Sequence, residues 1–281
     1  MGESFEVHRT LLERLAYRML GSRMDAEDIV QDTFLRFERA AVSPDNLRAW
    51  LFRCCVRLCM DRLKSAQRTR ESYIGPWLPE PFVEAEQASR AELDETLTLA
   101  LMVVLERLTP AERAAFILHD VFSYDFAEVS EVLGKTEANC RKLASRARQQ
   151  VAGGRPSLPL NQAEHERITR HFFDALKHGD ISALEAVLAE QVVLTTDGGG
   201  KVAAARRPIV GRPAVARFLT RVRAGAPPSV LVPRWFNGAL GRLAYFDGTP
   251  QGAFQLDVRG GLVVGVFIIR NPDKLSSFAP F

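Results

Sequence analysis

Residues 126–151, FAEVSEVLGKTEANCRKLASRARQQV, decide the fold class of the N-terminal half of the chain. Apolar residues recur at helical spacing up to Leu133. Gly134 follows, and glycine ends helices readily because it adopts the left-handed conformation without strain. Thr136 then offers a side-chain oxygen to the unpaired amides that begin a second helix. The stretch therefore predicts a short helix, a glycine turn and a longer helix.

The second predicted helix is basic on its outer face. Projected at about 100° per residue, its apolar stripe consists of Cys140, Leu143, Ala144, Ala147 and Val151. From Lys135 to Arg155, six lysines and arginines stand against one acid, Glu137, a local net charge of +5. A cationic helix after a tight turn is typical of a recognition helix in the DNA major groove, and a solvated charged helix is the alternative.

Residues 25–38, DAEDIVQDTFLRFE, predict a helix with an acidic outer face, because five acids stand against Arg36. The expected apolar face consists of Ala26, Ile29, Val30, Thr33 and Phe37. Leu35 projects instead among Asp28, Gln31 and Asp32. A leucine ringed by acids is suited to docking on a partner that carries arginines, although single exposed leucines are common.

The charge reverses in the next predicted helix, where residues 53–70 carry six arginines and lysines against Asp61. Asn46, Arg48 and Trp50 come just before this segment. Cations beside an aromatic ring are suited to single-stranded DNA, because the cations neutralise phosphates while unpaired bases stack. Trp50 is equally well explained as a core residue.

The composition is that of an ordinary globular protein. The 281 residues are 47% hydrophobic with a net charge of +3, which allows more than one buried core. The N-terminus lacks the apolar segment of a signal peptide, and the apolar run at 262–269 is too short to span a bilayer. The four cysteines (Cys54, Cys55, Cys59, Cys140) form no disulfide or metal-ligand pattern. We expect a cytoplasmic protein with buried thiols and without a metal, cofactor or membrane partner.

The chain changes character near residue 152. Helices are expected at 5–20, 25–40, 47–70, 92–107, 111–120, 125–133 and 136–151. Strands are expected at 191–196, 229–236, 239–246, 253–259 and 262–270, with helices in 160–190 and near 213–223. Two linkers stand out: IGPWLPEP (74–81), with three prolines, and GGRPSLP (153–159). Residues 80–95 carry six acids against Arg90 and predict either a shield for the cationic modules or a solvated spacer.

Together these segments resemble the extracytoplasmic-function (ECF) sigma factors of bacterial RNA polymerase. DAEDIVQDTFLRF is similar to the clamp-binding segment of their region 2, and NLRAWLFRCCVRLCMDRLKSAQR to the segment that opens and reads the −10 element. LTPAERAAFILHDVFSYDFAEVSEVLGKTEANCRKLASRAR resembles region 4, which binds the −35 element. The resemblance implies a transcription initiation factor, not an enzyme, with two partners: core RNA polymerase, through its clamp and flap, and promoter DNA.

The resemblance also implies three sets of contact residues. The set for core polymerase is Asp28, Gln31, Asp32 and Leu35. The set for −10 DNA is Asn46, Arg48, Trp50, Arg53, Arg57 and Arg62. The set for −35 DNA is Lys135, Thr136, Asn139, Arg141, Lys142, Ser145, Arg146 and Arg148.

Three short motifs resemble the signatures of a subgroup of these factors that carries a SnoaL-like C-terminal extension. They are WLPEP (Trp77, Leu78, Pro79, Glu80, Pro81), DGGGK (Asp197, Gly198, Gly199, Gly200, Lys201) and NPDKL (Asn271, Pro272, Asp273, Lys274, Leu275). The first lies in the linker between the two modules and the others lie in the C-terminal part. We therefore expect the motifs to meet, and the C-terminal domain to act as a partner in cis that regulates both modules.

The resemblance implies a multidomain protein with two all-α sigma modules and an α+β, cone-shaped, SnoaL-like domain. The expected boundaries are 1–73 for region 2, 74–95 for the inter-module linker, 96–152 for the region 4 helix–turn–helix, 153–159 for a second linker and 160–281 for the C-terminal domain.

The alternative is a helix–turn–helix regulator whose C-terminal pocket binds a small molecule or acts as an isomerase or cyclase. Relatives that resemble SnoaL include enzymes that use an Asp–His pair for proton transfer. The residues considered are His171, His178, Asp197, Asp247 and Asp257. No pairing among them is evident in the sequence, so no catalytic residue is assigned.

DGGGK does not match a phosphate-binding loop of the GxxxxGK[ST] type. The first glycine of that pattern is absent, and Val202 follows Lys201 where the hydroxyl residue is required. The motif is therefore expected to form a glycine turn that meets another part of the same chain.

Overall fold

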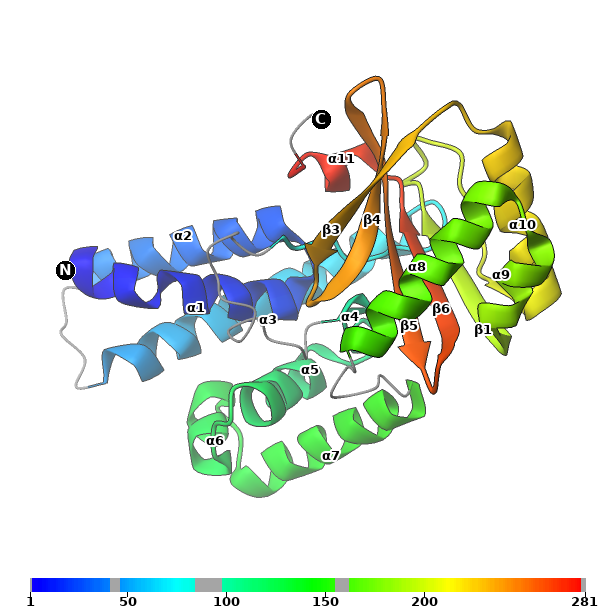
Figure 1. Ribbon diagram of the computed structural model, residues 1–281. Coiled ribbons are helices and arrows are strands. Elements are labelled where there is room, and N and C mark those ends of the chain that lie inside the picture. Colours follow the sequence, from blue (N-terminus) through cyan, green and yellow to red (C-terminus); the bar gives the residue numbers. More distant parts are fainter. Residues whose placement is uncertain (1, 41–45, 84–97, 155–161, 279–281) are drawn as a thin grey trace. The chain divides into compact units, whose positions relative to one another are not determined.

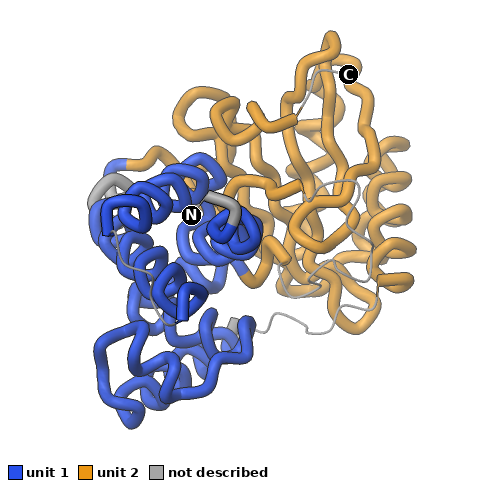
Figure 2. Tube along the Cα trace, turned by 90° about the vertical axis from the view of Figure 1, so that its left-hand side faces the viewer, with its two compact units in different colours: residues 1–72, 102–155 blue, residues 73–101, 156–281 orange. Residues whose placement is uncertain are grey.

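The computed structural model describes residues 2–40, 46–83, 98–154 and 162–278 (Figure 1). The chain divides into two compact units, residues 1–72 with 102–155 and residues 73–101 with 156–281 (Figure 2). The start of the inter-module linker therefore belongs to the same unit as the C-terminal domain. Most of the acidic segment and of the second linker lies in 84–97 and 155–161, outside the described residues.

The first unit begins with three packed helices, α1 (Gly2–Leu20), α2 (Arg23–Ala40) and α3 (Leu47–Glu71). Their apolar faces meet in a core that includes the fully buried residues Leu12, Val30 and Phe52. All four cysteines are buried free thiols. These helices correspond to the predicted ones because the apolar residues recur every three or four positions and so share one face.

The same unit continues with α5 (Pro110–Phe116), the π-helical turn η1 (Ile117–Val121), α6 (Phe126–Leu133) and α7 (Glu137–Gly154). Thr109 and Asp125 begin α5 and α6 with capping boxes that Glu112 and Glu128 complete. Gly134 ends α6 in the left-handed conformation with φ +62°. The helix–turn–helix predicted from residues 126–151 is thus present. A short helix, α4 (Leu99–Leu105), spans the sequence boundary between the two units.

The second unit contains a six-stranded sheet in the order β2-β1-β6-β5-β4-β3. The strands are β1 (Leu188–Asp197), β2 (Ile209–Val210), β3 (Val230–Phe236), β4 (Ala239–Phe246), β5 (Thr249–Arg259) and β6 (Leu262–Ile269). β1 is parallel to β6, and the other pairs are antiparallel. Register shifts in β1, β4 and β5 bend the sheet, since an irregular pairing increases local twist.

Helices α8 (Gln162–His178), α9 (Ile181–Val187) and α10 (Arg212–Gly225) cover one face of this sheet (Figure 1). Their core includes Phe172, Leu184 and Leu219 packed with Leu194 and Val266. A last short helix, α11 (Pro272–Leu275), follows β6 directly. The five predicted strands are confirmed in position, and β2 is an addition that is too short for an alternating pattern. Among the described residues, no helix combines the length and apolar character needed to cross a bilayer.

Candidate functional site

The residues predicted for −35 DNA lie on the outer face of α7 or, for Lys135 and Thr136, in the turn before it, and all eight are exposed. The Asn139 amide donates to Thr136 Oγ1 at 3.3 Å, so Thr136 caps the helix. The Arg141 guanidinium lies 5.0 Å from the centre of the Phe126 ring and 2.9 Å from Glu137. Arg148 lies 2.6 Å from Asp120. The neighbouring helix and turn therefore orient two of the cations that this surface presents.

The acidic face of α2 is also open to solvent. Asp28, Gln31 and Asp32 are exposed, and Leu35 retains 37% of its surface. Arg62 lies 2.6 Å from Asp25 and 3.4 Å from Asp28. One residue predicted for −10 DNA therefore pairs with the edge of the predicted polymerase-docking face.

Other residues predicted for −10 DNA lie beside the helix–turn–helix within the first unit. Arg53 Nη2 lies 3.2 Å from Glu131 of α6. The Arg48 guanidinium lies 5.7 Å from the centre of the Tyr124 ring. Arg57 Nη2 lies 4.0 Å from the point where a Cβ on Gly134 would stand. Arg48 and Arg53 therefore have contacts with the helix–turn–helix module, and Arg57 lies close to its glycine turn.

The two remaining residues of this set have local structural roles. The Ala49 amide donates to Asn46 Oδ1 at 3.0 Å, so Asn46 caps α3. Trp50 is half-buried, with its ring centre 6.0 Å from that of Phe37. Trp50 is thus partly a core residue, as one of its two interpretations predicts.

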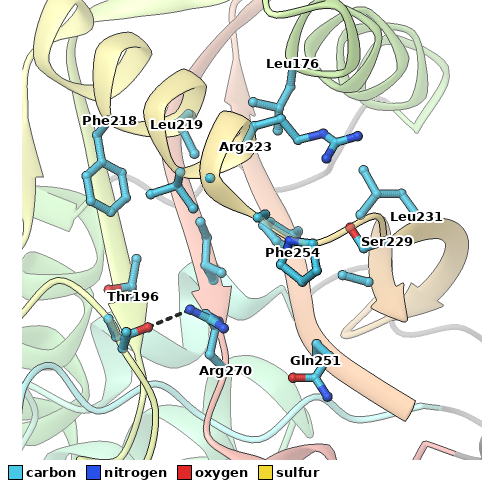
Figure 3. A pocket seen from close by; sticks show the side chains of 18 of the residues that line it. Leu176, Thr196, Phe218, Leu219, Arg223, Ser229, Leu231, Gln251, Phe254 and Arg270 are labelled. Carbon is cyan, nitrogen blue, oxygen red and sulfur yellow. Dashed lines mark hydrogen bonds between the residues drawn. The ribbon is translucent and has the colours of Figure 1, made fainter. Parts of the chain in front are cut away.

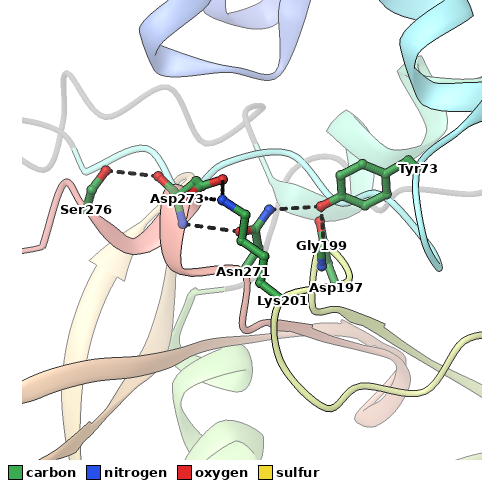
Figure 4. A network of polar contacts seen from close by, with 7 residues as sticks. All are labelled: Tyr73, Asp197, Gly199, Lys201, Asn271, Asp273 and Ser276. Carbon is green, nitrogen blue, oxygen red and sulfur yellow. Dashed lines mark hydrogen bonds and ion pairs between the residues drawn. The ribbon is translucent and has the colours of Figure 1, made fainter.

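The second unit brings the three motifs together around Asp197, which is fully buried. Tyr73 Oη donates to Asp197 Oδ1 at 2.6 Å and accepts from Asn271 Nδ2 at 3.0 Å (Figure 4). The Gly199 amide also donates to Asp197 Oδ1, at 3.0 Å. Burial and the hydrogen bond to Asp197 raise the pKa of Tyr73, so its hydroxyl stays protonated and donates. We call this set, with Lys274 and Leu78 described next, the motif cluster.

Lys274 is the cation of the motif cluster. Its Nζ lies 2.7 Å from Asp197 Oδ2 and also donates to the backbone oxygen of Leu78. The same Nζ lies 4.0 Å from the centre of the Trp77 ring, a cation–π distance. The Leu78 amide donates to Asp197 Oδ2 at 2.8 Å. Backbone groups of WLPEP therefore bind side chains of DGGGK and NPDKL.

Two glycines of DGGGK are required by these contacts. Gly199 has φ +60°, and a Cβ there would stand 2.4 Å from Asn271 Nδ2. Gly200 has φ +72°, and a Cβ there would stand 2.9 Å from Ile74 Cδ1. Both positions combine a left-handed backbone with a close approach, which only glycine tolerates without displacing a neighbour.

An exposed ion pair flanks the buried one. Lys201 Nζ lies 2.6 Å from Asp273 Oδ2, and both side chains keep more than half of their surface, at 55% and 63%. This pair joins the second and third motifs. Because water screens it, it contributes far less to stability than the buried contact.

The C-terminal domain also binds Phe82 of the linker and Leu99 at the start of α4, at points that the sequence did not indicate. The Phe82 amide donates to Asn237 Oδ1 at 3.0 Å, and the Asn237 amide donates to Phe82 O at 2.9 Å. The Leu99 amide donates to Gln255 Oε1 at 3.1 Å. Gln255 is a buried residue of β5, and Asn237 is buried in the turn between β3 and β4. No sequence pattern singles out either residue, because the burial of an amide side chain is not visible in the sequence.

The residues considered for proton transfer do not converge. His171, His178 and Asp247 are exposed, and Asp197 belongs to the motif cluster. Asp257 is buried and bound by Arg259, and burial raises its pKa. His165, which the sequence reading missed, is buried with Nε2 3.1 Å from Leu256 O, and burial lowers its pKa. Within the described chain, no group of three potential metal ligands occurs.

Comparison with known families identifies both modules of the first unit. Residues 5–69 match the model of Sigma-70 region 2, and residues 98–151 match that of Sigma-70, region 4. These modules define the class, sigma factors of the sigma-70 type.

The chain is 38% identical to the ECF RNA polymerase sigma factor SigJ of Mycobacterium tuberculosis (strain H37Rv), over 97% of this chain and 92% of that relative. It is 33% identical to the probable ECF RNA polymerase sigma factor SigI of M. tuberculosis (strain CDC 1551), over 97% and 93%. The crystal structure of M. tuberculosis SigJ matches with a TM-score of 0.80 and 37% identity, over 98% of each chain. The chain belongs to the ECF RNA polymerase sigma factors.

The family confirms the expected fold and function. Helical region 2 and region 4 modules precede a C-terminal α+β domain, and the protein is a transcription initiation factor. Its sigma modules imply binding to core RNA polymerase and promoter DNA.

Proposed function

We propose that the C-terminal domain regulates this sigma factor in cis by holding the linker between region 2 and region 4. The observation that carries the proposal is the buried contact of Lys274 with Asp197 and with the backbone oxygen of Leu78. Breaking such a contact leaves a buried charge without its partner, so the linker is held tightly while the cluster is intact.

A linker bound to the C-terminal domain restricts the positions that region 2 and region 4 can adopt relative to each other. Region 2 has to reach the −10 element while region 4 reaches the −35 element, and the linker is the covalent connection between them. Hydrogen bonds fix this connection at Leu78 and Phe82, and they fix the start of α4 at Leu99. Free movement of region 4 relative to region 2 therefore requires these contacts to open.

The contact residues fit the same proposal. Asp28, Gln31, Asp32 and Leu35 are exposed and suited to dock on the polymerase clamp. The outer face of α7 is suited to −35 DNA, and region 4 to the polymerase flap. Arg48 and Arg53 contact Tyr124 and Glu131 in the free chain. Their use at the −10 element competes with these contacts, and polymerase binding would favour a form in which both arginines are released.

A linker-side variant separates regulation from folding of the C-terminal domain. Deleting residues 160–281 is a poor test, because Leu78 and Leu99, both fully buried, would lose their cover. Trp77→Ala removes the ring that covers Lys274. With purified core polymerase, we expect Trp77→Ala to give more run-off transcript than the unchanged chain at a limiting sigma concentration.

The matched control is Val83→Ala, another half-buried linker residue. It should give the transcript level of the unchanged chain. Equal transcript from Trp77→Ala and Val83→Ala, with hydrogen exchange proving that the Leu78 amide has opened only in the former, would refute regulation through the linker.

A further inference from the structure

The second unit contains a cavity of about 540 Å³ between α8, α10 and the sheet (Figure 3). This is the size of a cavity that encloses a small organic molecule. Most of its lining is apolar, with the rings of Phe173, Phe218 and Phe254 among the larger side chains. Val222 and Phe246 also line it and keep 47% and 42% of their surface, so the mouth of the cavity is apolar too.

The charged part of the lining is cationic, beside the neutral polar residues Thr196, Ser229 and Gln251. Arg223 and Arg270 line the cavity, and none of its described lining residues is an aspartate, glutamate, histidine, lysine or cysteine. The surrounding sequence reinforces this charge, because residues 198–246 contain nine lysines and arginines and no acid. A cavity with apolar walls and charges of one sign attracts small molecules of the opposite charge. The lining also offers no side chain suited to accept a proton at neutral pH, which favours binding over acid–base catalysis.

Arg270 is placed to receive an anion. Its Nη1 donates to Ala203 O at 2.6 Å, on the wall of the cavity (Figure 3). A guanidinium has five N–H donors in a planar fork that fits a carboxylate. A carboxylate that enters the cavity would therefore compete with the Ala203 carbonyl for this side chain.

We propose that the cavity binds a small organic acid with an apolar, ring-containing body, whose carboxylate pairs with Arg270 and whose body packs among the phenylalanines. Binding of this acid opens the motif cluster, because three chain segments that line the cavity continue directly into the cluster. Thr196 and Arg270 line the cavity, and Asp197 and Asn271 are their neighbours in the cluster. The Arg270 amide donates to Asp197 O at 2.7 Å.

The third shared segment is the loop after DGGGK. Ala203, Ala204 and Ala205 line the cavity a few residues beyond Lys201. The Ala205 amide donates to Thr196 Oγ1 at 2.7 Å, which fixes this loop to β1. Displacing Ala203 O from Arg270 loosens the loop and, through it, the glycine turn that contacts Asn271 and Ile74. An acid in the cavity therefore releases the linker, a consequence that rests on the regulation proposed above.

The test compares 2-naphthoate with its neutral analogue 2-naphthamide, titrated calorimetrically into the full chain. We expect saturable binding of one naphthoate, at least about tenfold tighter than naphthamide, because a charged hydrogen-bond pair replaces a neutral one. Arg270→Gln should bring naphthoate down to the affinity of naphthamide. Ala244→Phe, which fills the cavity from β4, should weaken both. Arg221→Gln, an exposed cation of α10 outside the lining, should change neither.

The comparison of naphthoate with naphthamide uses the unchanged chain, so its result is valid even if a variant fails to fold. Equal affinities for the two compounds, no binding of naphthoate, or full binding by folded Ala244→Phe would overturn the proposed site. A separate measurement tests whether binding opens the motif cluster. We expect the Lys201 and Leu78 amides to exchange faster in the naphthoate-bound chain than in the free chain. Unchanged exchange in the saturated chain would overturn that opening while leaving the binding site, and the result for Trp77→Ala, intact.

Discussion

Lys274 and Asp197 form an ion pair that is almost completely removed from solvent, with Nζ 2.7 Å from Oδ2 and side-chain exposures of 6% and 0%. Leu78 of the linker binds both members of the pair, because its amide donates to Asp197 Oδ2 and its carbonyl accepts from Lys274 Nζ. Asp197 Oδ1 accepts from Tyr73 Oη and from the Gly199 amide. The pair therefore does more than stabilise the C-terminal domain, since it is complete only when the linker is in place.

Lys274→Met should destabilise the second unit by about 3–5 kcal/mol, because Asp197 would stay buried without its cation. Urea unfolding followed by tryptophan fluorescence measures this loss. Lys201→Met removes the neighbouring exposed pair with Asp273 and should cost about 1 kcal/mol or less. Similar losses of unfolding free energy for the two variants would show that the buried pair stabilises the second unit no more than the exposed pair does.

Gly199→Ala should move Asn271 and open the motif cluster. The added Cβ would stand 2.4 Å from Asn271 Nδ2 on a backbone with φ +60°. Gly260→Ala shares the left-handed backbone, φ +54°, but has nothing within 4 Å of the added Cβ. Both variants carry a backbone penalty of about 1 kcal/mol, so the extra loss in Gly199→Ala reports the clash. Equal unfolding midpoints for Gly199→Ala and Gly260→Ala would show that a Cβ at position 199 does not clash with Asn271.

His165 should make the second unit sensitive to mild acid. Burial lowers its pKa in the folded chain, whereas the unfolded chain binds the proton at about pH 6.5. The unfolded state is thus protonated first, so stability is complete above about pH 6.5 and falls as the pH decreases toward the folded pKa. The slope approaches about 1.4 kcal/mol per pH unit for one proton.

His165→Gln should remove this slope while keeping a donor for Leu256 O. Asp257 has a raised pKa that acts in the opposite direction, and it interacts with His165, so the change in slope reports the two groups together. His171→Gln, at an exposed position of the same helix, should keep the slope of the unchanged chain. Parallel pH profiles for His165→Gln and the unchanged chain would contradict the assignment.

Tyr124→Ala should loosen the contact between α3 and α6. The Tyr124 ring is stacked on Phe52 with centres 5.3 Å apart, and Arg48 lies over it. Loss of a buried ring costs about 3–5 kcal/mol. Hydrogen exchange in residues 51–56 should therefore accelerate, whereas Val7→Ala, at a position that is 80% exposed, should leave it unchanged. Unaltered exchange in Tyr124→Ala would show that α3 does not depend on region 4.

Much of the fold follows from local sequence. The period of Cys140, Ala144 and Ala147 predicted the buried face of α7, and these residues are buried, because helix geometry alone determines which side chains share a face. The same holds for Gly134, whose conformation follows from its place after Leu133. β2 was not predicted, because a strand of two residues is too short to show an alternation of apolar and polar side chains.

The sequence predicted that the three motifs of the cluster would meet, but it did not predict the individual contacts between them. Tyr73 lies 124 positions before Asp197, and no local pattern links them. Asn237 and Gln255 bind the backbone amides of Phe82 and Leu99, and a backbone partner leaves no side-chain signature in the sequence. The cavity is also a product of packing, since the bend of the sheet and the placement of α10 decide whether space remains between them.

The amide of Leu78 tests the central claim most directly, because it donates to Asp197 only while the linker is held. Hydrogen exchange is measured on the free chain and on its complex with core polymerase, with the β6 amides as internal reference. We predict that Leu78 is protected in the free chain and loses this protection in the complex while β6 stays protected. Undiminished protection of Leu78 in a complex that initiates transcription at full rate would contradict regulation through the linker.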